Sequence, residues 1–152
     1  MKNLLIYTFR TNPFKDKLIR NFPESFIFGK LKEDFQKFSE LITRETPSLV
    51  LGIASSNSSS RFEPIAINQF NVNKKIVPMA PTSLPLFIPR NVPLETSKIT
   101  TDSFCNWSMY QIANFIENNE LDTKLSFAHV NEEDVDDMIN WIKSEEKSES
   151  KQ

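Results

Sequence analysis

Short apolar runs and helix-like patterns follow one another along this chain of 152 residues. Four apolar runs have the length and composition of buried strands: residues 3–9, 48–53, 65–70 and 125–130. Three segments carry apolar residues as helices do: residues 31–44, residues 104–116 and the segment that Asn131 caps. Because strands and helices are interspersed along the chain, the pattern predicts an α/β fold.

Prolines and polar tracts mark the segments between these elements. Residues 10–30 contain two prolines and a glycine, which predicts a loop or irregular structure. Residues 71–93 contain five prolines, which exclude a long helix and leave an extended segment with a short edge strand near residues 86–88. Residues 55–60 are almost all serine and predict a flexible loop. Residues 95–101 favour a further strand because they contain Thr and Ile.

The length and composition fit a single globular domain. A chain of this size has one domain by the usual range of domain sizes, and we place it at residues 1–143. Residues 144–152 are charged and serine-rich, which predicts a frayed tail. An apolar content of 39% with 25% charged residues is typical of a globular protein rather than of a disordered chain.

Charge and cysteine usage exclude several classes of function. The net charge of −2 and the lack of a basic stripe with interleaved aromatic residues argue against general nucleic-acid binding. The N-terminal apolar stretch is too short for a signal peptide, and no run has the length of a membrane span. A single cysteine excludes an internal disulfide and fits a reducing compartment. We therefore expect a cytoplasmic protein that binds neither nucleic acid nor membranes.

The only cysteine and the only histidine lie where they could act together. Cys105 is at the head of an apolar helical segment, and His129 is near the end of a strand-like run. A thiol becomes a strong nucleophile when it loses its proton, and a helix N-terminus or a neighbouring imidazole promotes that loss. The alternative is that Cys105 is a small buried apolar residue and His129 a satisfied structural one. No cluster of His and Cys could bind zinc, so we expect no metal site.

Three segments around these two residues carry a recognisable pattern. Glu63 is the eleventh residue after Gly52, and His129 lies 24 residues after Cys105. The matching positions are Glu63, Ile65, Ala66 and Asn68 in the first segment, Ser97, Cys105, Asn106 and Tyr110 in the second, and Phe127, His129 and Val130 in the third. Each segment alone is weakly specific, but their shared order around a sole thiol and a sole imidazole makes the combination more specific.

In these residues the chain resembles the pyroglutamyl-peptidase I family of cysteine peptidases. The segments of that family have the forms G-x-x-(G/A/P)-x-x-x-x-(L/I/V)-(S/T)-x-E-(K/R)-(L/I/V/C)-A-x-(N/G), S-x-S-A-G-x-(F/Y)-x-C-N and (G/F)-F-(I/L)-H-(V/I). This chain departs from them at Ser55, Ser60, Arg61 and Pro64, and it has Thr100-Thr101 in place of the Ala-Gly pair. It is also shorter than the family pattern, with no room for a helix between the proline-rich segment and Ser97.

The resemblance implies a fold and an activity. Family members are cysteine exopeptidases that remove an N-terminal pyroglutamyl residue from peptides, and they use no metal or organic cofactor. Their fold is a three-layer α/β/α sandwich with a central mixed sheet, of the phosphorylase/hydrolase-like type. Many are homotetramers, so the resemblance also implies a homo-oligomer. The implied partner is a peptide with an N-terminal pyroglutamate.

The resemblance also assigns roles to individual residues. Cys105 would be the nucleophile, a partly exposed thiol at a helix N-terminus that Asp102 or Ser103 caps. His129 would take the thiol proton and later protonate the leaving amine. Glu63 would orient the imidazole, although the residue alone would more simply be a solvated charge at a loop–strand junction. The pyroglutamyl ring would pack against Phe9 and Phe14 of the loop after the first strand.

Three functions are compatible with these matches and departures. The first is an active pyroglutamyl peptidase with a Cys-His-Glu triad. The second is a cysteine amidase of the same fold that acts on another small substrate, because the loop around Ser55 differs from the family pattern. The third is a non-enzymatic relative that uses the cleft to bind a peptide end or a subunit.

Overall fold

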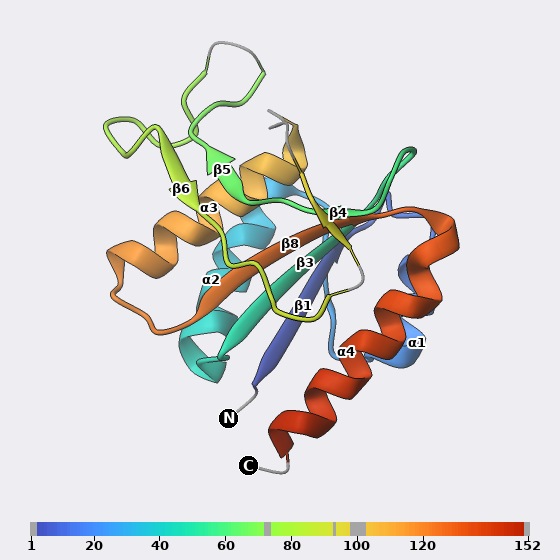
Figure 1. Ribbon diagram of the computed structural model, residues 1–152. Coiled ribbons are helices and arrows are strands. Elements are labelled where there is room, and N and C mark those ends of the chain that lie inside the picture. Colours follow the sequence, from blue (N-terminus) through green and yellow to red (C-terminus); the bar gives the residue numbers. More distant parts are fainter. Residues whose placement is uncertain (1–2, 72–73, 93, 98–102, 151–152) are drawn as a thin grey trace.

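A computed structural model of the protein describes residues 3–71, 74–92, 94–97 and 103–150 (Figure 1). Within these residues six strands form one sheet in the order β2-β1-β3-β8-β4-β7. The strands of this sheet are β1 (Leu4–Phe9), β2 (Phe26–Phe28), β3 (Leu49–Ser55), β4 (Arg61–Phe62), β7 (Glu95–Thr96) and β8 (Lys124–Val130). Strands β2, β1, β3 and β8 are parallel neighbours, whereas β4 pairs with β8 in the antiparallel sense. The sheet is therefore mixed.

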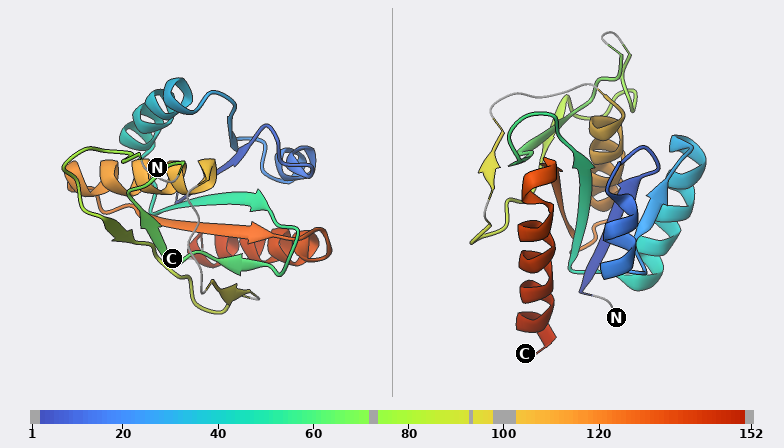
Figure 2. Two further views of the ribbon diagram at one scale, coloured as in Figure 1. Left: turned by 90° about the horizontal axis from the view of Figure 1, so that it is seen from above. Right: turned by 90° about the vertical axis from the view of Figure 1, so that its right-hand side faces the viewer.

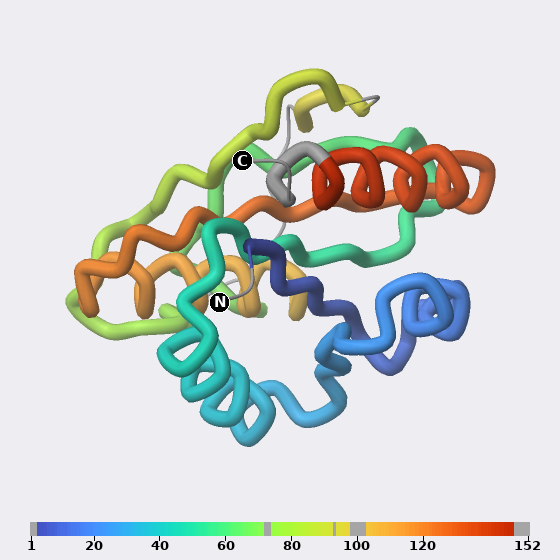
Figure 3. The backbone as a smooth tube through the Cα atoms, turned by 90° about the horizontal axis from the view of Figure 1, so that it is seen from below, coloured from blue at the N-terminus to red at the C-terminus, as the bar shows by residue number. Residues whose placement is uncertain are grey.

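Helices cover both faces of this sheet. The helices in the described part of the chain are α1 (Lys15–Asn21), α2 (Leu31–Glu45), α3 (Phe104–Asn118), α4 (Val135–Ser150) and the short 3₁₀ helix η1 (Glu132–Asp134). Helices α2 and α3 pack with one cluster of buried residues, and α1 and α4 pack with the other. Figures 2 and 3 show α1 and α4 on one side of the strands and α2 and α3 on the other. The architecture is a three-layer α/β/α sandwich.

Alternation along the strands divides the buried residues between these two faces. On β1, Leu5 and Tyr7 belong to the cluster under α2 and α3, whereas Ile6 belongs to the cluster under α1 and α4. On β8, Phe127 lies in the first cluster and Ala128 in the second. Successive side chains of a strand point to opposite faces. The sheet is thus buried on both sides, which explains why its strands are nearly continuous apolar runs.

Gly52 on β3 makes room for two aromatic rings in the cluster under α2 and α3. A Cβ atom at this position would lie 2.5 Å from Cζ of Tyr7 and 2.5 Å from Cδ2 of Phe127, whose rings are fully buried. These rings cannot move aside without disturbing a close-packed core. Only a residue without a side chain fits here.

We expect Gly52→Ala to lower the free energy of unfolding by about 1–3 kcal/mol, the usual cost of overpacking a core. Chemical denaturation followed by fluorescence or circular dichroism measures this change. Gly29→Ala is the matched control, because a Cβ atom there would lie 3.6 Å or more from its neighbours. The control should stay within about 0.5 kcal/mol of the native chain. Equal stability of both variants would contradict the packing argument.

Residues 10–30 are not irregular, and the prediction of a loop there is wrong. They contain α1 and β2, and Leu18 of α1 is almost fully buried. The two prolines of this segment lie on either side of α1 and not within it, where a proline costs no helical hydrogen bond. The short helix forms because its apolar side packs on the sheet, which local composition does not reveal.

Two strand predictions need correction. The strand predicted at residues 65–70 covers only Ile65–Ile67, here β5, and Pro64 separates it from β4, which the sequence patterns did not predict. Strand β5 pairs with β6 (Ser83–Pro85) in a two-stranded antiparallel sheet, so the edge strand lies before residues 86–88 and not within them. Proline lacks the N–H that a continuing ladder requires, which explains the break.

The remaining elements agree with the sequence patterns, except at the C-terminus. The predictions of helices at residues 31–44 and 104–116 and of strands at residues 3–9, 48–53 and 125–130 are confirmed to within a few residues. The strand expected at residues 95–101 is observed as β7, and residues 98–101 lie outside the described part. Asn131 caps η1, and α4 continues through the expected tail as far as Ser150. Its charged residues Lys143, Glu145, Glu146 and Lys147 are compatible with a helix because they are exposed.

Candidate active site

Three separate elements bring Cys105, His129 and Glu63 to one end of the sheet. Cys105 lies in the first turn of α3, and His129 is the last residue but one of β8. Glu63 follows β4 directly. His129 shares its face of the sheet with Phe127, which packs in the cluster under α3. The site is therefore at the carboxyl end of β8, where α/β folds usually bind ligands.

A buried hydrogen bond joins Glu63 to His129. Oε1 of Glu63 lies 2.9 Å from Nδ1 of His129, and the two residues are 2% and 7% exposed. A carboxylate can only accept hydrogen bonds, so it favours the tautomer in which Nδ1 carries the proton. Nε2 then has a free lone pair with which it can accept a proton. The expectation that one imidazole nitrogen faces the Glu63 carboxylate agrees with this geometry.

The pairing of β4 with β8 explains why Glu63 reaches the imidazole. The two strands are antiparallel, with Arg61 opposite His129 and Phe62 opposite Ala128. The backbone N–H of Glu63 donates to the carbonyl of Phe127 at 2.9 Å, which extends the same register by one residue. Arg61 and Glu63 are two residues apart, so both side chains project from the face that carries His129. Glu63 is consequently a diagonal neighbour of the histidine and not a solvated charge.

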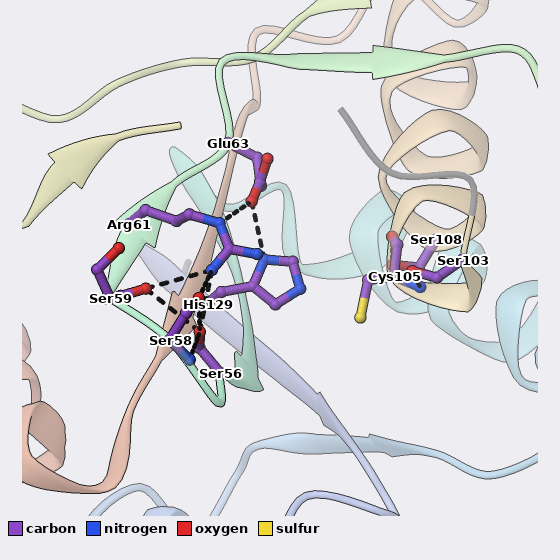
Figure 4. A network of polar contacts seen from close by, with 9 residues as sticks. All are labelled: Ser56, Ser58, Ser59, Arg61, Glu63, Ser103, Cys105, Ser108 and His129. Carbon is purple, nitrogen blue, oxygen red and sulfur yellow. Dashed lines mark hydrogen bonds and ion pairs between the residues drawn. The ribbon is translucent and has the colours of Figure 1, made fainter. Parts of the chain in front are cut away.

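Arg61 is a member of this network that the sequence patterns did not indicate. Its Nε donates to the same Oε1 of Glu63 at 3.1 Å. Its Nη1 donates to Oγ of Ser56 at 2.9 Å, to Oγ of Ser58 at 3.4 Å and to the carbonyl of Ser59 at 3.2 Å (Figure 4). The serine-rich loop therefore binds the guanidinium group, although its composition alone predicts only flexibility.

The Cys105 thiol is buried, so the expectation of a partly exposed, activated thiol is wrong. Ser103 is the N-cap of α3, and its Oγ accepts a hydrogen bond from the Cys105 N–H at 3.3 Å. Cys105 is only 5% exposed. The pKa of its thiol is raised from 9.0 to about 12, mainly by burial; the hydrogen bond with Ser103 and the charge of Arg61 act to lower this pKa, and the charge of Glu63 acts to raise it. Asp102, the other expected cap, lies outside the described residues.

A chain of aromatic contacts links the cysteine turn to the histidine. Phe104 precedes Cys105 and lies against Phe9, with ring centroids 4.9 Å apart. The ring centroids of Phe9 and Phe127 are 6.3 Å apart, and those of Phe127 and His129 are 5.1 Å apart. Figure 4 shows the Cys105 sulfur extending from α3 on the side where the imidazole lies. The fold thus places the thiol and the imidazole on one face of the sheet.

The buried thiol should react slowly with alkylating reagents at neutral pH. A pKa of about 12 instead of 9.0 lowers the thiolate fraction at pH 7 by about 10³-fold. We expect iodoacetamide to modify Cys105 in the native protein far more slowly than it modifies free cysteine. Because the raised pKa keeps the thiol protonated, the rate should keep rising above pH 9. Mass spectrometry at a series of pH values measures this rate, with the denatured chain as control. Alkylation of the native chain as fast as that of free cysteine at pH 7 would contradict the burial of the thiol.

The two phenylalanines expected to hold a substrate ring lie in different clusters. Phe9 is 3% exposed and packs in the cluster under α2 and α3. Phe14 precedes α1 and packs against the cluster on the opposite face of the sheet. They therefore do not form one slot. Phe104, which is 40% exposed and rests on Phe9, is an aromatic residue at the surface in the same helical turn as Cys105.

Two asparagines of the matched segments anchor the strand next to the site. Oδ1 of Asn106 accepts from the N–H of Ile67 at 2.9 Å, and its Nδ2 donates to the carbonyls of Ile67 and Gln69. Oδ1 of Asn68 accepts from the N–H groups of Ile76 and Val77. These bonds satisfy backbone groups that β5 and the following loop do not pair with each other. Asn106 therefore ties the first turn of α3 to β5, and Asn68 holds the loop that follows β5.

A large cavity in the described part of the chain lies away from this site. A cavity of ≈ 930 Å³ lies at the amino ends of β1, β3 and β8, and none of Cys105, His129 and Glu63 lines it. The residues that the structure describes include no group of three or more His, Cys, Asp or Glu side chains that could hold a metal ion. None of the helices seen in these ranges has the length and apolar character that crossing a membrane requires.

The fold is that of the pyrrolidone carboxyl peptidases. No family model and no curated protein matches the sequence. Among solved structures, the pyrrolidone carboxyl peptidase of Thermococcus litoralis matches 86% of this chain and 77% of its own, with a TM-score of 0.71 and 18% identity. A single-residue variant of the Pyrococcus furiosus enzyme matches with a TM-score of 0.66 and 19% identity, covering 86% of this chain and 81% of its own.

Pyroglutamyl peptidase I of Bacillus amyloliquefaciens has the same fold at still lower identity. It matches 86% of this chain and 81% of its own, with a TM-score of 0.66 and 14% identity. The chain therefore has a peptidase-like α/β/α fold with a central mixed sheet, as the resemblance predicted. Its sequence has diverged so far that the shared architecture, and not sequence identity, connects it with these enzymes.

Proposed function

We propose that the protein is a cysteine exopeptidase that removes an N-terminal pyroglutamyl residue from peptides. The observation that carries this proposal is the buried Glu63–His129 hydrogen bond beside the helix that bears the only thiol. The three residues occupy the matching positions of the pyroglutamyl-peptidase I pattern. The solved structures of the same fold bear the names pyrrolidone carboxyl peptidase and pyroglutamyl peptidase I.

In the proposed reaction the resting thiol is neutral and loses its proton during attack. His129 accepts this proton at Nε2 while the Cys105 sulfur attacks the carbonyl carbon of the substrate amide. Glu63 holds Nδ1 and stabilises the imidazolium that forms. The imidazolium then protonates the leaving amine, and water releases pyroglutamate from the thioester. A neutral resting thiol is compatible with the raised pKa of Cys105.

The proposed specificity depends on an apolar surface beside the thiol. A pyroglutamyl ring is a small, flat and neutral lactam, so it suits an aromatic surface together with a donor and an acceptor for its amide. Phe104 presents such a surface, and Phe9 supports it from the core. We assign the supporting role to Phe9 and give none to Phe14.

Release of a fluorophore from a pyroglutamyl amide by the purified protein tests the proposal. The expected result is turnover of the pyroglutamyl amide and little turnover of prolyl and glutamyl amides. The prolyl analogue lacks the lactam oxygen, and the glutamyl analogue adds charge. Equal turnover of pyroglutamyl and prolyl amides would replace the proposal with a cysteine amidase of broader specificity. No turnover of any of them would contradict the proposed pyroglutamyl peptidase.

The burial of Cys105 is the observation that favours a second candidate function. A thiol with 5% exposure and a raised pKa fits a non-enzymatic relative that binds a peptide end or a subunit in the same place. Binding of a pyroglutamyl peptide without its hydrolysis, measured by calorimetry and followed by mass spectrometry, would identify this candidate.

A further inference from the structure

We propose that Arg61 is a positioning residue for the imidazole of His129 and acts through the Glu63 carboxylate. The inference rests on the proposed function for its catalytic consequence, but its structural content stands without that function. Arg61 lies at a position where the chain departs from the family pattern. Its role therefore follows from the contacts of this chain alone.

Arg61 and His129 bind the same oxygen atom. Oε1 of Glu63 lies 3.1 Å from Nε of Arg61 and 2.9 Å from Nδ1 of His129. The Glu63 side chain is 3% exposed, so water contributes little to its orientation. A buried carboxylate is costly unless it is paired and hydrogen-bonded. The guanidinium group supplies both the compensating charge and a directed hydrogen bond.

The serine loop holds the other end of the guanidinium group. Nη1 of Arg61 donates to Ser56 Oγ, while Ser56 Oγ also accepts from the N–H of Ser58 at 3.1 Å. A planar guanidinium with donors at fixed angles can bridge two acceptors in a way that a lysine ammonium cannot. The loop, Arg61 and Glu63 therefore form one rigid bridge that ends at the imidazole, which Figure 4 shows as a continuous set of dashed contacts.

This bridge determines which nitrogen of His129 carries the proton. With Oε1 fixed in front of Nδ1, the neutral imidazole bears its proton on Nδ1 and leaves Nε2 free. Without the guanidinium, the carboxylate loses both a hydrogen bond and the charge that compensates it. The carboxylate is then free to turn away from Nδ1, and the preference for the Nδ1–H tautomer is lost.

The single histidine of this chain makes a direct test possible. Nitrogen-15 NMR of protein labelled at histidine gives one imidazole, whose two chemical shifts report which nitrogen is protonated. In the native chain we expect the neutral imidazole to carry its proton on Nδ1. In Arg61→Met the share of this form should fall by about 3- to 10-fold, the effect of losing one hydrogen bond. Arg61→Lys keeps a charge but not the bridge, so it should give an intermediate share.

Two further variants keep the test decisive if Arg61→Met does not fold. Ser56→Ala removes one acceptor of Nη1 from a loop residue and should change the imidazole in the same direction by a smaller amount. Arg44→Met is the matched control, because Arg44 is exposed and pairs only with Glu45 among the described ion pairs. It should leave both shifts unchanged. Native shifts in folded Arg61→Lys and Ser56→Ala would overturn the proposal.

Kinetics separate this inference from the proposed function. If the protein hydrolyses a pyroglutamyl amide, Arg61→Lys should lower kcat and leave KM nearly unchanged, because Arg61 binds Glu63 and the serine loop and acts on the imidazole through the carboxylate. A merely structural role would lower stability and leave kcat per folded molecule unchanged, which would overturn the inference. If no amide is hydrolysed, the proposed function fails, while the NMR result still decides whether Arg61 positions the imidazole.

Discussion

Replacement of Cys105 by alanine should abolish hydrolysis of a pyroglutamyl amide. The chain has no other thiol, and a methyl group cannot form the covalent intermediate. We expect kcat/KM to fall by at least about 10⁴-fold, since loss of a nucleophile that works with a base removes the contribution of both. Steady-state kinetics with a fluorogenic substrate measure the change, and the native protein treated with iodoacetamide at pH 9 should lose activity in parallel with alkylation.

Met138→Leu is a suitable control for Cys105→Ala. Met138 is buried in the cluster on the opposite face of the sheet, and the exchange preserves side-chain volume. Its activity should equal that of the native chain. Circular dichroism must show both variants folded. Residual activity of Cys105→Ala near that of the native protein would show that the thiol is not the nucleophile.

Glu63→Gln should lower kcat by about 10²- to 10⁴-fold with little change in KM, because a neutral amide cannot stabilise the imidazolium that forms during the reaction. The glutamine side chain has the same shape, and its amide oxygen can still accept from Arg61 and from Nδ1 of His129. The negative charge beside the imidazole is therefore the feature that this substitution removes. Steady-state kinetics measure the change.

The same substitution should also lower stability, because Arg61 loses its charged partner. Arg61 is 22% exposed at its side chain, so we expect a loss of about 1–3 kcal/mol in the free energy of unfolding. Glu133→Gln, at an exposed position of η1, is the control and should change neither kcat nor stability. Full activity of Glu63→Gln would leave at most a Cys105–His129 pair as the catalytic unit.

The contacts of Arg61 show how the tertiary structure gives the serine-rich loop a binding role that its composition does not reveal. A run of serines predicts a flexible loop by composition, and Arg61 is known from the sequence only as a departure from the family pattern. Pairing of β4 with β8 places this arginine opposite His129. Only then do the serines have a guanidinium group to bind, and only then does the carboxylate of Glu63 have two donors.

Local patterns determined the elements that hold the site. The apolar runs of β3 and β8 and the apolar helix α3 could be predicted because burial on both sides of a sheet, or on most sides of a helix, requires such sequences. The sole cysteine and the sole histidine limited a thiol–imidazole pair to one choice. The spacing of the family motif from Gly52 indicated Glu63 as the third residue of the site. These features depend on composition and on near neighbours, which a sequence displays directly.

Long-range packing decided what the sequence by itself could not. Helix α1 forms because its apolar side meets the sheet, and Pro64 lies where the chain passes from β4 in the six-stranded sheet to β5 in the two-stranded sheet. The exposure of Cys105 depends on what the fold places around it, so the sequence could not show that its thiol is buried with a raised pKa. Phe9 and Phe14 are five residues apart in the sequence, yet they pack on opposite faces because the chain turns at the end of β1. Burial, register and shared partners arise from contacts between distant segments, which only the tertiary structure determines.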